Sequence, residues 1–227
     1  MTFLGPQRGA PLAPALVDTR REYDHLFGIY VPIAVAVFGI VVLTMLFAVV
    51  RYHFRRPEKA ARWHEAHVIE GTYALLLLCT VVFLLYETYS TEHRVDTVAN
   101  REKPAVKIDV IASRWEWTFR YPQYNITIHS GTSGDSTFVV PAGEPVAFYL
   151  STLDVIHAFW IPALRFKHDN NPGTTQRITL VFPHAGLYSG QCAEFCGLNH
   201  AEMVFNTRAV SPARFAAWAR SGGKSGP

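Results

Sequence analysis

Two long apolar stretches occupy the first third of the chain. Residues 27–50 contain no charged side chain, and residues 68–86 contain one, Glu70, near their start. A helix of such length crosses a hydrocarbon core about 30 Å thick at a rise of ~1.5 Å per residue. Neither stretch has the polar face that helices of soluble proteins carry. We therefore predict a membrane-spanning helical hairpin over residues 27–89, preceded by an N-terminal arm, residues 1–26.

The segment between the two stretches is rich in basic residues. Two acidic residues, Glu58 and Glu65, are outnumbered there by Arg51, Arg55, Arg56, Lys59 and Arg62. Short loops with such an excess face the cytoplasm. The arm and everything after the second stretch are then expected on the opposite, periplasmic side of a bacterial inner membrane. The arm has no apolar core of signal-peptide length, so we expect no cleavage.

The pattern changes from helical to strand-like after a polar linker, residues 90–104. Short alternating or β-branched runs, separated by glycine and proline, indicate an antiparallel barrel or sandwich over residues 105–227. A final helix is expected at 212–220, because Ser211 suits an N-cap and proline follows it. The expected strands are 106–111, 115–121, 125–129, 136–140, 145–151, 176–182, 186–191 and 203–210.

Composition excludes several classes of protein. An apolar fraction of 49% excludes disorder, and 21 Lys plus Arg against 18 Asp plus Glu give no reason to expect a nucleic-acid partner. The 3 cysteines are too few for a disulfide-rich scaffold. Cys79 lies in an apolar stretch and is interpreted as a packing residue.

The remaining cysteines belong to a group of metal-binding side chains. Cys192, Cys196, His200 and Met203 lie within one short segment. Thiolate and thioether favour reduced copper, and imidazole accepts either oxidation state, so this set suits a copper site that changes redox state. A structural zinc site would have no use for Met203.

A second cysteine favours a pair of ions over a single one. A mononuclear blue-copper site uses one thiolate with two histidines, whereas two bridging thiolates would join two ions, each with one histidine. The second histidine must come from elsewhere, and His157, expected after a strand, is the best candidate. A disulfide between Cys192 and Cys196 is the alternative. On composition alone, three other histidines could take the place of His157 as ligand: His129, His168 and His184.

Three segments together resemble subunit II of cytochrome c oxidase. They are residues 190–203 (GQCAEFCGLNHAEM), 154–162 (DVIHAFWIP) and 167–173 (KHDNNPG). The resemblance implies a two-helix transmembrane hairpin followed by an all-β, cupredoxin-like Greek-key barrel or sandwich. It also implies a dinuclear copper A centre, with Glu194 binding through its backbone carbonyl and with side-chain ligands His157, Cys192, Cys196, His200 and Met203.

The resemblance suggests roles for three more residues. Glu194 would also offer its carboxylate to magnesium at the boundary with subunit I, although it could simply orient the copper loop. Trp115, paired with Trp117, would admit electrons from cytochrome c, whereas alternating tryptophans in a strand usually serve packing. Glu70 would mark the mouth of a proton channel, with an interfacial carboxylate as the alternative.

The implied function is electron uptake by a terminal respiratory oxidase. Single electrons would pass from cytochrome c through the copper pair to the haem of subunit I, where oxygen is reduced to water and protons are pumped; subunit III is a further expected partner. No C-x-x-C-H run is present for a covalent haem, so the donor is a separate protein. A copper A subunit of a nitric oxide reductase, a copper chaperone and a metal-free quinol-oxidase subunit remain alternatives. The acidic residues that could meet the donor are Glu116, Asp135, Asp154 and Asp169.

Overall fold

The chain divides into two compact units. The computed structural model describes residues 18–54, 66–101, 103–130 and 137–224. One unit is Glu22–His93, and the other contains the described residues from Arg94 onward together with the first residues of the first helix. The basic segment 55–62 and Asp135 lie outside the described residues, as does most of the predicted arm.

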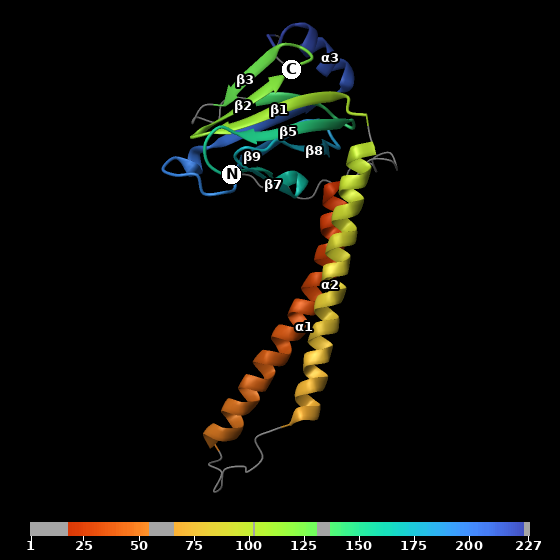
Figure 1. Ribbon diagram of the computed structural model, residues 1–227, viewed down its shortest axis with the longest axis vertical. Coiled ribbons are helices and arrows are strands. Elements are labelled where there is room, and N and C mark those ends of the chain that lie inside the picture. Colours follow the sequence, from red (N-terminus) through yellow and green to blue (C-terminus); the bar gives the residue numbers. More distant parts are fainter. Residues whose placement is uncertain (1–17, 55–65, 102, 131–136, 225–227) are drawn as a thin grey trace. The chain divides into compact units, whose positions relative to one another are not determined.

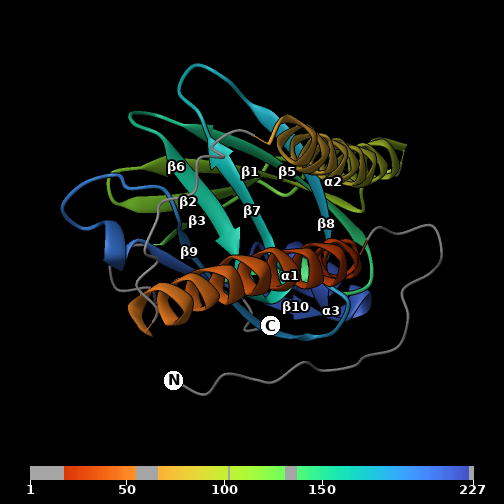
Figure 2. The same cartoon turned by 90° about the horizontal axis from the view of Figure 1, so that it is seen from below.

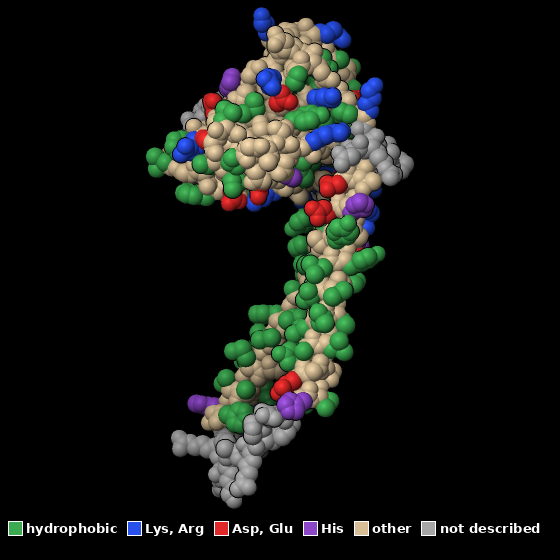
Figure 3. Space-filling model, viewed as in Figure 1, with side chains coloured by type: hydrophobic (Ala, Val, Ile, Leu, Met, Phe, Trp, Pro, Cys, Tyr) green, Lys and Arg blue, Asp and Glu red, His purple; other side chains and the backbone are tan. Residues whose placement is uncertain are grey.

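The helical unit is built from α1 (Thr19–Phe54) and α2 (His67–Arg101) (Figure 1). By length and composition both could cross a membrane, since their most apolar 18-residue stretches have mean hydropathies of 3.0 and 2.2. Hydrophobic side chains cover most of their visible length, and charged ones lie near their ends (Figure 3). The Tyr30 hydroxyl donates to the carbonyl of Leu84 at 3.1 Å, joining the two helices.

Both helices are longer than the apolar pattern predicts. The first begins at Thr19, so residues 19–26 of the expected arm are helical. The second continues to Arg101, so most of the expected linker, residues 90–104, is helical and the linker prediction was wrong there. Once a helix is nucleated each added residue gains a hydrogen bond, so polar residues can extend it beyond the apolar stretch.

The other unit is a sandwich of two sheets, seen from two directions in Figure 1 and Figure 2. One 5-stranded sheet has the order β3-β2-β1-β5-β8, and the other has the order β4-β10-β9-β6-β7. The strands are β1 (Val106–Ser113), β2 (Glu116–Tyr121), β3 (Ile126–Ser130), β4 (Thr137–Pro141), β5 (Pro145–Thr152), β6 (His157–Ile161), β7 (Phe166–Asn170), β8 (Gln176–Val181), β9 (Gly186–Cys192) and β10 (Val204–Val210).

The predicted two-helix hairpin and β-sandwich are confirmed, and the sandwich has two strands that were not predicted. Most neighbouring strands are antiparallel as expected, but β1 pairs with β5, and β4 with β10, in parallel. The sequence reading missed β6 and β7, and it started β2 at Trp115, which lies in the turn before that strand. His157 follows the strand β5, as expected, and it is also the first residue of β6.

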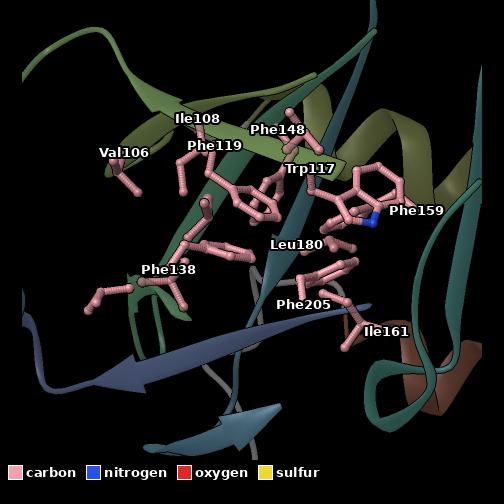
Figure 4. Close-up of a cluster of buried hydrophobic side chains, with 14 of the residues drawn as sticks. Val106, Ile108, Trp117, Phe119, Phe138, Phe148, Phe159, Ile161, Leu180 and Phe205 are labelled. Atoms are coloured by element: carbon pink, nitrogen blue, oxygen red, sulfur yellow. The ribbon is translucent and has the colours of Figure 1, made fainter. Parts of the chain in front are cut away.

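Aromatic side chains from both sheets fill the space between them. Trp117 of β2 lies edge-on to Phe159 and Phe205, with ring centroids 5.8 and 5.4 Å apart (Figure 4). One end of the core is covered by α3 (Pro212–Arg220), whose N-cap Ser211 accepts a hydrogen bond from the Arg214 amide, as predicted. This packed interior holds the strand ends that carry the candidate site.

Candidate metal centre

The predicted ligands meet at one end of three neighbouring strands. His157 is the first residue of β6, Cys192 is the last residue of β9, and Met203 directly precedes β10. The Cys192 amide donates to the Met203 carbonyl at 2.9 Å, closing the base of the loop between β9 and β10. That loop carries Cys196 and His200, so His157 and four side chains of one short segment converge on one place.

Two stacked phenyl rings, and a glycine that leaves room for them, form the interior beneath these donors. Successive side chains of a strand point to opposite faces, so residues two apart share a face. Two positions inward from the three strand-borne donors lie Phe159, Gly190 and Phe205. The two phenyl rings are stacked, with centroids 4.9 Å apart and planes at 1°. A Cβ on Gly190 would lie 2.1 Å from Cζ of Phe205, so the glycine makes room for the stack.

Each cysteine sulfur lies beside a different imidazole nitrogen. Cys192 Sγ is 3.7 Å from His157 Nδ1, and Cys196 Sγ is 3.5 Å from His200 Nδ1. The two sulfurs are 3.9 Å apart, and both cysteines are free. Since a disulfide requires about 2.05 Å, the disulfide alternative does not describe this structure. The donor atoms of His157, Cys192 and Cys196 all lie within 4.8 Å of one another.

Two further donors complete the arrangement, one beside each sulfur. The Met203 Sδ atom is 3.8 Å from Cys196 Sγ, and the Glu194 carbonyl oxygen is 3.2 Å from Cys192 Sγ. Four side chains are buried, and His200 is partly exposed. The cluster therefore has two similar halves, each offering one imidazole and one weaker donor around a shared pair of sulfurs. This donor set fits two soft cations better than one.

The pKa values of the two thiols also indicate that a bound cation would be needed to ionise both of them. Burial opposes ionisation of Cys192, but hydrogen bonds from His157 and the backbone outweigh it and lower its pKa to about 6. Burial and the charge of Cys192 raise the pKa of Cys196 to about 12. Ionisation of one thiol therefore opposes ionisation of the other. Positive charge is needed to keep both sulfurs deprotonated.

Sequence reasoning missed the role of Asp154 as the partner of His157. Its Oδ1 is 2.9 Å from His157 Nε2, the ring nitrogen that faces away from the sulfurs. Burial would lower the pKa of His157, but hydrogen bonds to Cys192 and Asp154 raise it. Burial would likewise raise the pKa of Asp154, but hydrogen bonds from His157, Arg114 and Val155 hold that pKa below its usual range. Metal-binding histidines commonly use such a partner, so the aspartate three residues before His157 was an available signal.

The two tryptophans take different positions. Trp117 is fully buried, its ring centroid is 6.2 Å from that of His157, and its Nε1 donates to the Met203 carbonyl at 3.3 Å. Trp115 is only partly buried and packs over the ligand loop, where a Cβ on Gly197 would lie 3.2 Å from its Cζ2. Among the described residues no acceptor pairs with Trp115 Nε1. One indole is therefore part of the core, and the other covers the loop.

Other predicted residues lie apart from the cluster or touch it differently. The Glu194 carboxylate is 3.6 Å from Lys167 Nζ. Glu70 lies in the first turn of α2, where its Oε1 accepts from the Ala66 amide at 3.4 Å. The three alternative histidine ligands are outside the cluster: the hydroxyl of Thr118 is the partner of His129, the Asp169 carbonyl is the partner of His168, and His184 precedes β9.

Comparisons with known proteins point to one family of proteins. Residues 128–210 match the family model described as cytochrome c oxidase subunit II, periplasmic domain. Subunit 2 of cytochrome c oxidase from Bacillus sp. (strain PS3) is 35% identical over 67% of this chain, and that from Alkalihalophilus pseudofirmus is 30% identical over 95%. The chain spans 46% and 62% of these relatives' lengths. The crystal structure of the periplasmic domain of subunit II of cytochrome oxidase from Bradyrhizobium japonicum matches 54% of this chain and 96% of that one, with 30% identity and a TM-score of 0.50.

Two candidate membrane spans followed by a cupredoxin-like sandwich with clustered sulfur and imidazole donors define a class of proteins that combine a helical hairpin with a candidate metal centre. The matches narrow this class. The chain belongs to the cytochrome c oxidase subunit II family.

Proposed function

We propose that this chain takes up electrons for a haem-copper oxidase in the bacterial inner membrane. Single electrons would come from cytochrome c or an equivalent donor and pass to the haem of subunit I, where oxygen is reduced to water and protons are pumped. The relay would be a copper A centre held by His157, Cys192, Cys196, His200, Met203 and the Glu194 carbonyl. Subunits I and III are the partners that family membership implies.

One observation carries the proposal: each sulfur lies beside its own imidazole. The Cys192–His157 and Cys196–His200 distances are 3.7 and 3.5 Å, around sulfurs 3.9 Å apart. A copper pair bound there would accept and release one electron at a time. The chain's contribution is to hold soft donors on strand ends above packed aromatic rings. Such a rigid frame keeps ligand movement small when the charge changes.

Three residues have accessory roles in this proposal. Trp115 would admit electrons, since its indole packs against Gly197, next to the ligand Cys196. Glu194 would offer its carboxylate to magnesium at the boundary with subunit I, after displacing Lys167. Glu70 would mark the mouth of a proton path at the start of α2.

Copper content of the purified full chain in detergent tests the proposal. We expect two copper ions per chain, and fewer after Cys196→Ser or His200→Ala. The control is His129→Ala, because His129 lies on β3 with Thr118 as partner and should leave both ions bound. One ion per chain would indicate a blue-copper or chaperone site, and none would contradict copper binding altogether.

The terminal reaction needs a separate measurement. The complex that co-purifies with the chain should contain haem and consume oxygen when a reduced cytochrome c is supplied. Consumption of nitric oxide instead of oxygen would assign the chain to a nitric oxide reductase and contradict the oxidase proposal.

A further inference from the structure

A hollow lies at the end of the sandwich that is remote from the candidate ligands. Its volume is about 310 Å³, and it is lined by the start of β9, the end of β10 and the first turn of α3. Gly186 lines the hollow, and Cys192 follows it six positions later at the other end of β9. At about 3.3 Å per residue, roughly 20 Å separate the two. The hollow is therefore distinct from the cluster of sulfur and imidazole donors.

Two exposed arginines line the hollow. Arg208 comes from β10 and Arg214 from α3, so the cationic residues belong to two separate elements. Within the part of the chain that the structure describes, neither of them forms an ion pair. Arg114 and Arg120 of the same domain, in contrast, each pair with an aspartate, at 3.2 and 2.7 Å.

The chain segments that form the hollow carry no acidic residue. Residues 203–227 contain three arginines and one lysine but no Asp or Glu, and residues 181–193 contain no charged residue of either sign. The turn between β4 and β5 adjoins the hollow, because the Ala142 amide donates to the Val210 carbonyl at 2.7 Å. Glu144 of that turn forms no ion pair with any described residue. An anion that enters the hollow therefore meets two arginines that no carboxylate neutralises.

An apolar side chain and a hydroxyl group lie beside the arginines. Leu187 is opposite Arg208 in the pairing of β9 with β10, and it is 52% exposed. The Ser211 oxygen accepts from the Arg214 amide at 3.4 Å, and among the described contacts its hydroxyl hydrogen has no acceptor. The hollow thus combines two cations with one hydroxyl donor and one exposed apolar surface.

We propose that this hollow is a binding site for a phosphate group, which Arg208 and Arg214 bind together while Leu187 contacts an apolar part of the same ligand. One guanidinium donates two parallel hydrogen bonds to a pair of oxygens, so a single arginine already satisfies a carboxylate. A phosphate monoester offers three acceptor oxygens and a charge of about −2, so it can use both arginines at once. Two sources supply such a group: a soluble phosphate ester and the headgroup of an anionic phospholipid.

Binding is measured on the full chain in a neutral detergent and a phosphate-free buffer. The probes are inorganic phosphate, adenosine monophosphate and mixed micelles that contain phosphatidylglycerol, with phosphatidylcholine micelles as the blank. Titration calorimetry gives the affinity for each probe. Thermal unfolding reports the stabilisation, because a ligand that binds only the folded chain raises the melting temperature.

Four variants separate the parts of the site. Arg208→Gln and Arg214→Gln each remove one cation from the hollow, and Leu187→Ala removes the apolar contact. Arg177→Gln is the matched control, because Arg177 is exposed on β8, forms no ion pair within the described residues and lies outside the hollow. The three arginines are all exposed, so near-UV circular dichroism of their variants should stay native.

We expect one phosphate-bearing ligand per chain, bound saturably. Arg208→Gln and Arg214→Gln should each weaken binding by about tenfold or more, since each loses charge-assisted hydrogen bonds to the phosphate. Arg177→Gln should bind like the unmodified chain. Leu187→Ala should weaken binding of adenosine monophosphate or phosphatidylglycerol but not of inorganic phosphate. Tighter binding of the nucleotide identifies a soluble ligand, and tighter binding of phosphatidylglycerol identifies a lipid headgroup.

Two results would overturn the inference. One is the absence of saturable binding for all three probes; the other is an equal loss of affinity in Arg208→Gln, Arg214→Gln and Arg177→Gln, which would indicate unspecific attraction to net charge. Neither result bears on the proposed function, because the hollow and the candidate ligands are at opposite ends of β9. An unmodified chain that binds no copper but does bind a phosphate probe would defeat the proposed function and leave this inference standing.

Discussion

Gly190 offers a sharp test of the packing beneath the donor cluster. A Cβ at this position would lie 2.1, 2.2 and 2.9 Å from three atoms of the Phe205 ring. Carbon atoms pack at about 3.5 Å or more, so the ring would have to move by about 1.4 Å. It has little room, because it is stacked on Phe159 and lies against Trp117, with centroids 4.9 and 5.4 Å away.

The expected cost of Gly190→Ala follows from this confinement. Overpacking a rigid core costs about 1–3 kcal/mol, and the near absence of space puts this change at the upper end, about 3 kcal/mol. For a domain of this size that corresponds to a melting temperature lower by roughly 10 °C. Thermal unfolding of the full chain in detergent, followed by near-UV circular dichroism, reports on the aromatic core.

Gly186→Ala is the matched control on the same strand. Nothing lies within 4 Å of a Cβ at Gly186, so its effect should stay small. Adding Phe205→Leu to Gly190→Ala should restore part of the lost stability, because the smaller side chain vacates the contested space. A Gly190→Ala chain that melts within about 2 °C of Gly186→Ala would refute the reasoning.

Two further changes test other parts of the domain. Tyr121→Phe removes a buried hydroxyl that donates to the Val139 carbonyl at 2.7 Å and accepts from its amide at 3.0 Å, so urea unfolding should show a loss of about 1–3 kcal/mol; no change in the midpoint would contradict this. Gly197→Ala introduces a side chain at φ +120° and 3.2 Å from Trp115, so it should lower stability and shift tryptophan fluorescence. Gly143→Ala, at φ +76° with nothing within 4 Å, controls for backbone strain, and identical emission from the two variants would exclude displacement of Trp115.

The sequence predicted the elements that carry a strong local signal. Ser211 followed by Pro212 marked the start of α3 correctly, because the N-cap and the first helical turn have distinct requirements. The strand β6 was missed because most of its residues are buried on both faces, which removes the alternation. The strand β7 was missed because its sequence, FKHDN, is mostly polar, as an edge strand allows.

The candidate site was predictable where its members are close in sequence. Spacing alone identified the loop from Cys192 to Met203, and the strand expected before His157 made that histidine the best further candidate, which the resemblance then also implied. Asp154, Trp117 and Gly190 act through contacts that depend on strand register, which the sequence does not specify directly.

Some candidate ligands lie at strand ends and others lie in a loop. This arrangement determines where the chain can tolerate an inserted or deleted residue. Cys192 and Gly190 share a face of β9 only because they are two residues apart, and β9 is paired on both sides. One inserted residue between them would turn the thiol away from the imidazole of His157. The segment between Cys196 and His200 is outside the strand pairing, so changes in its length would not shift the sheet register. Length variation that keeps the site intact should therefore be confined to loops without candidate ligands, and the strands beneath the site should keep their phase.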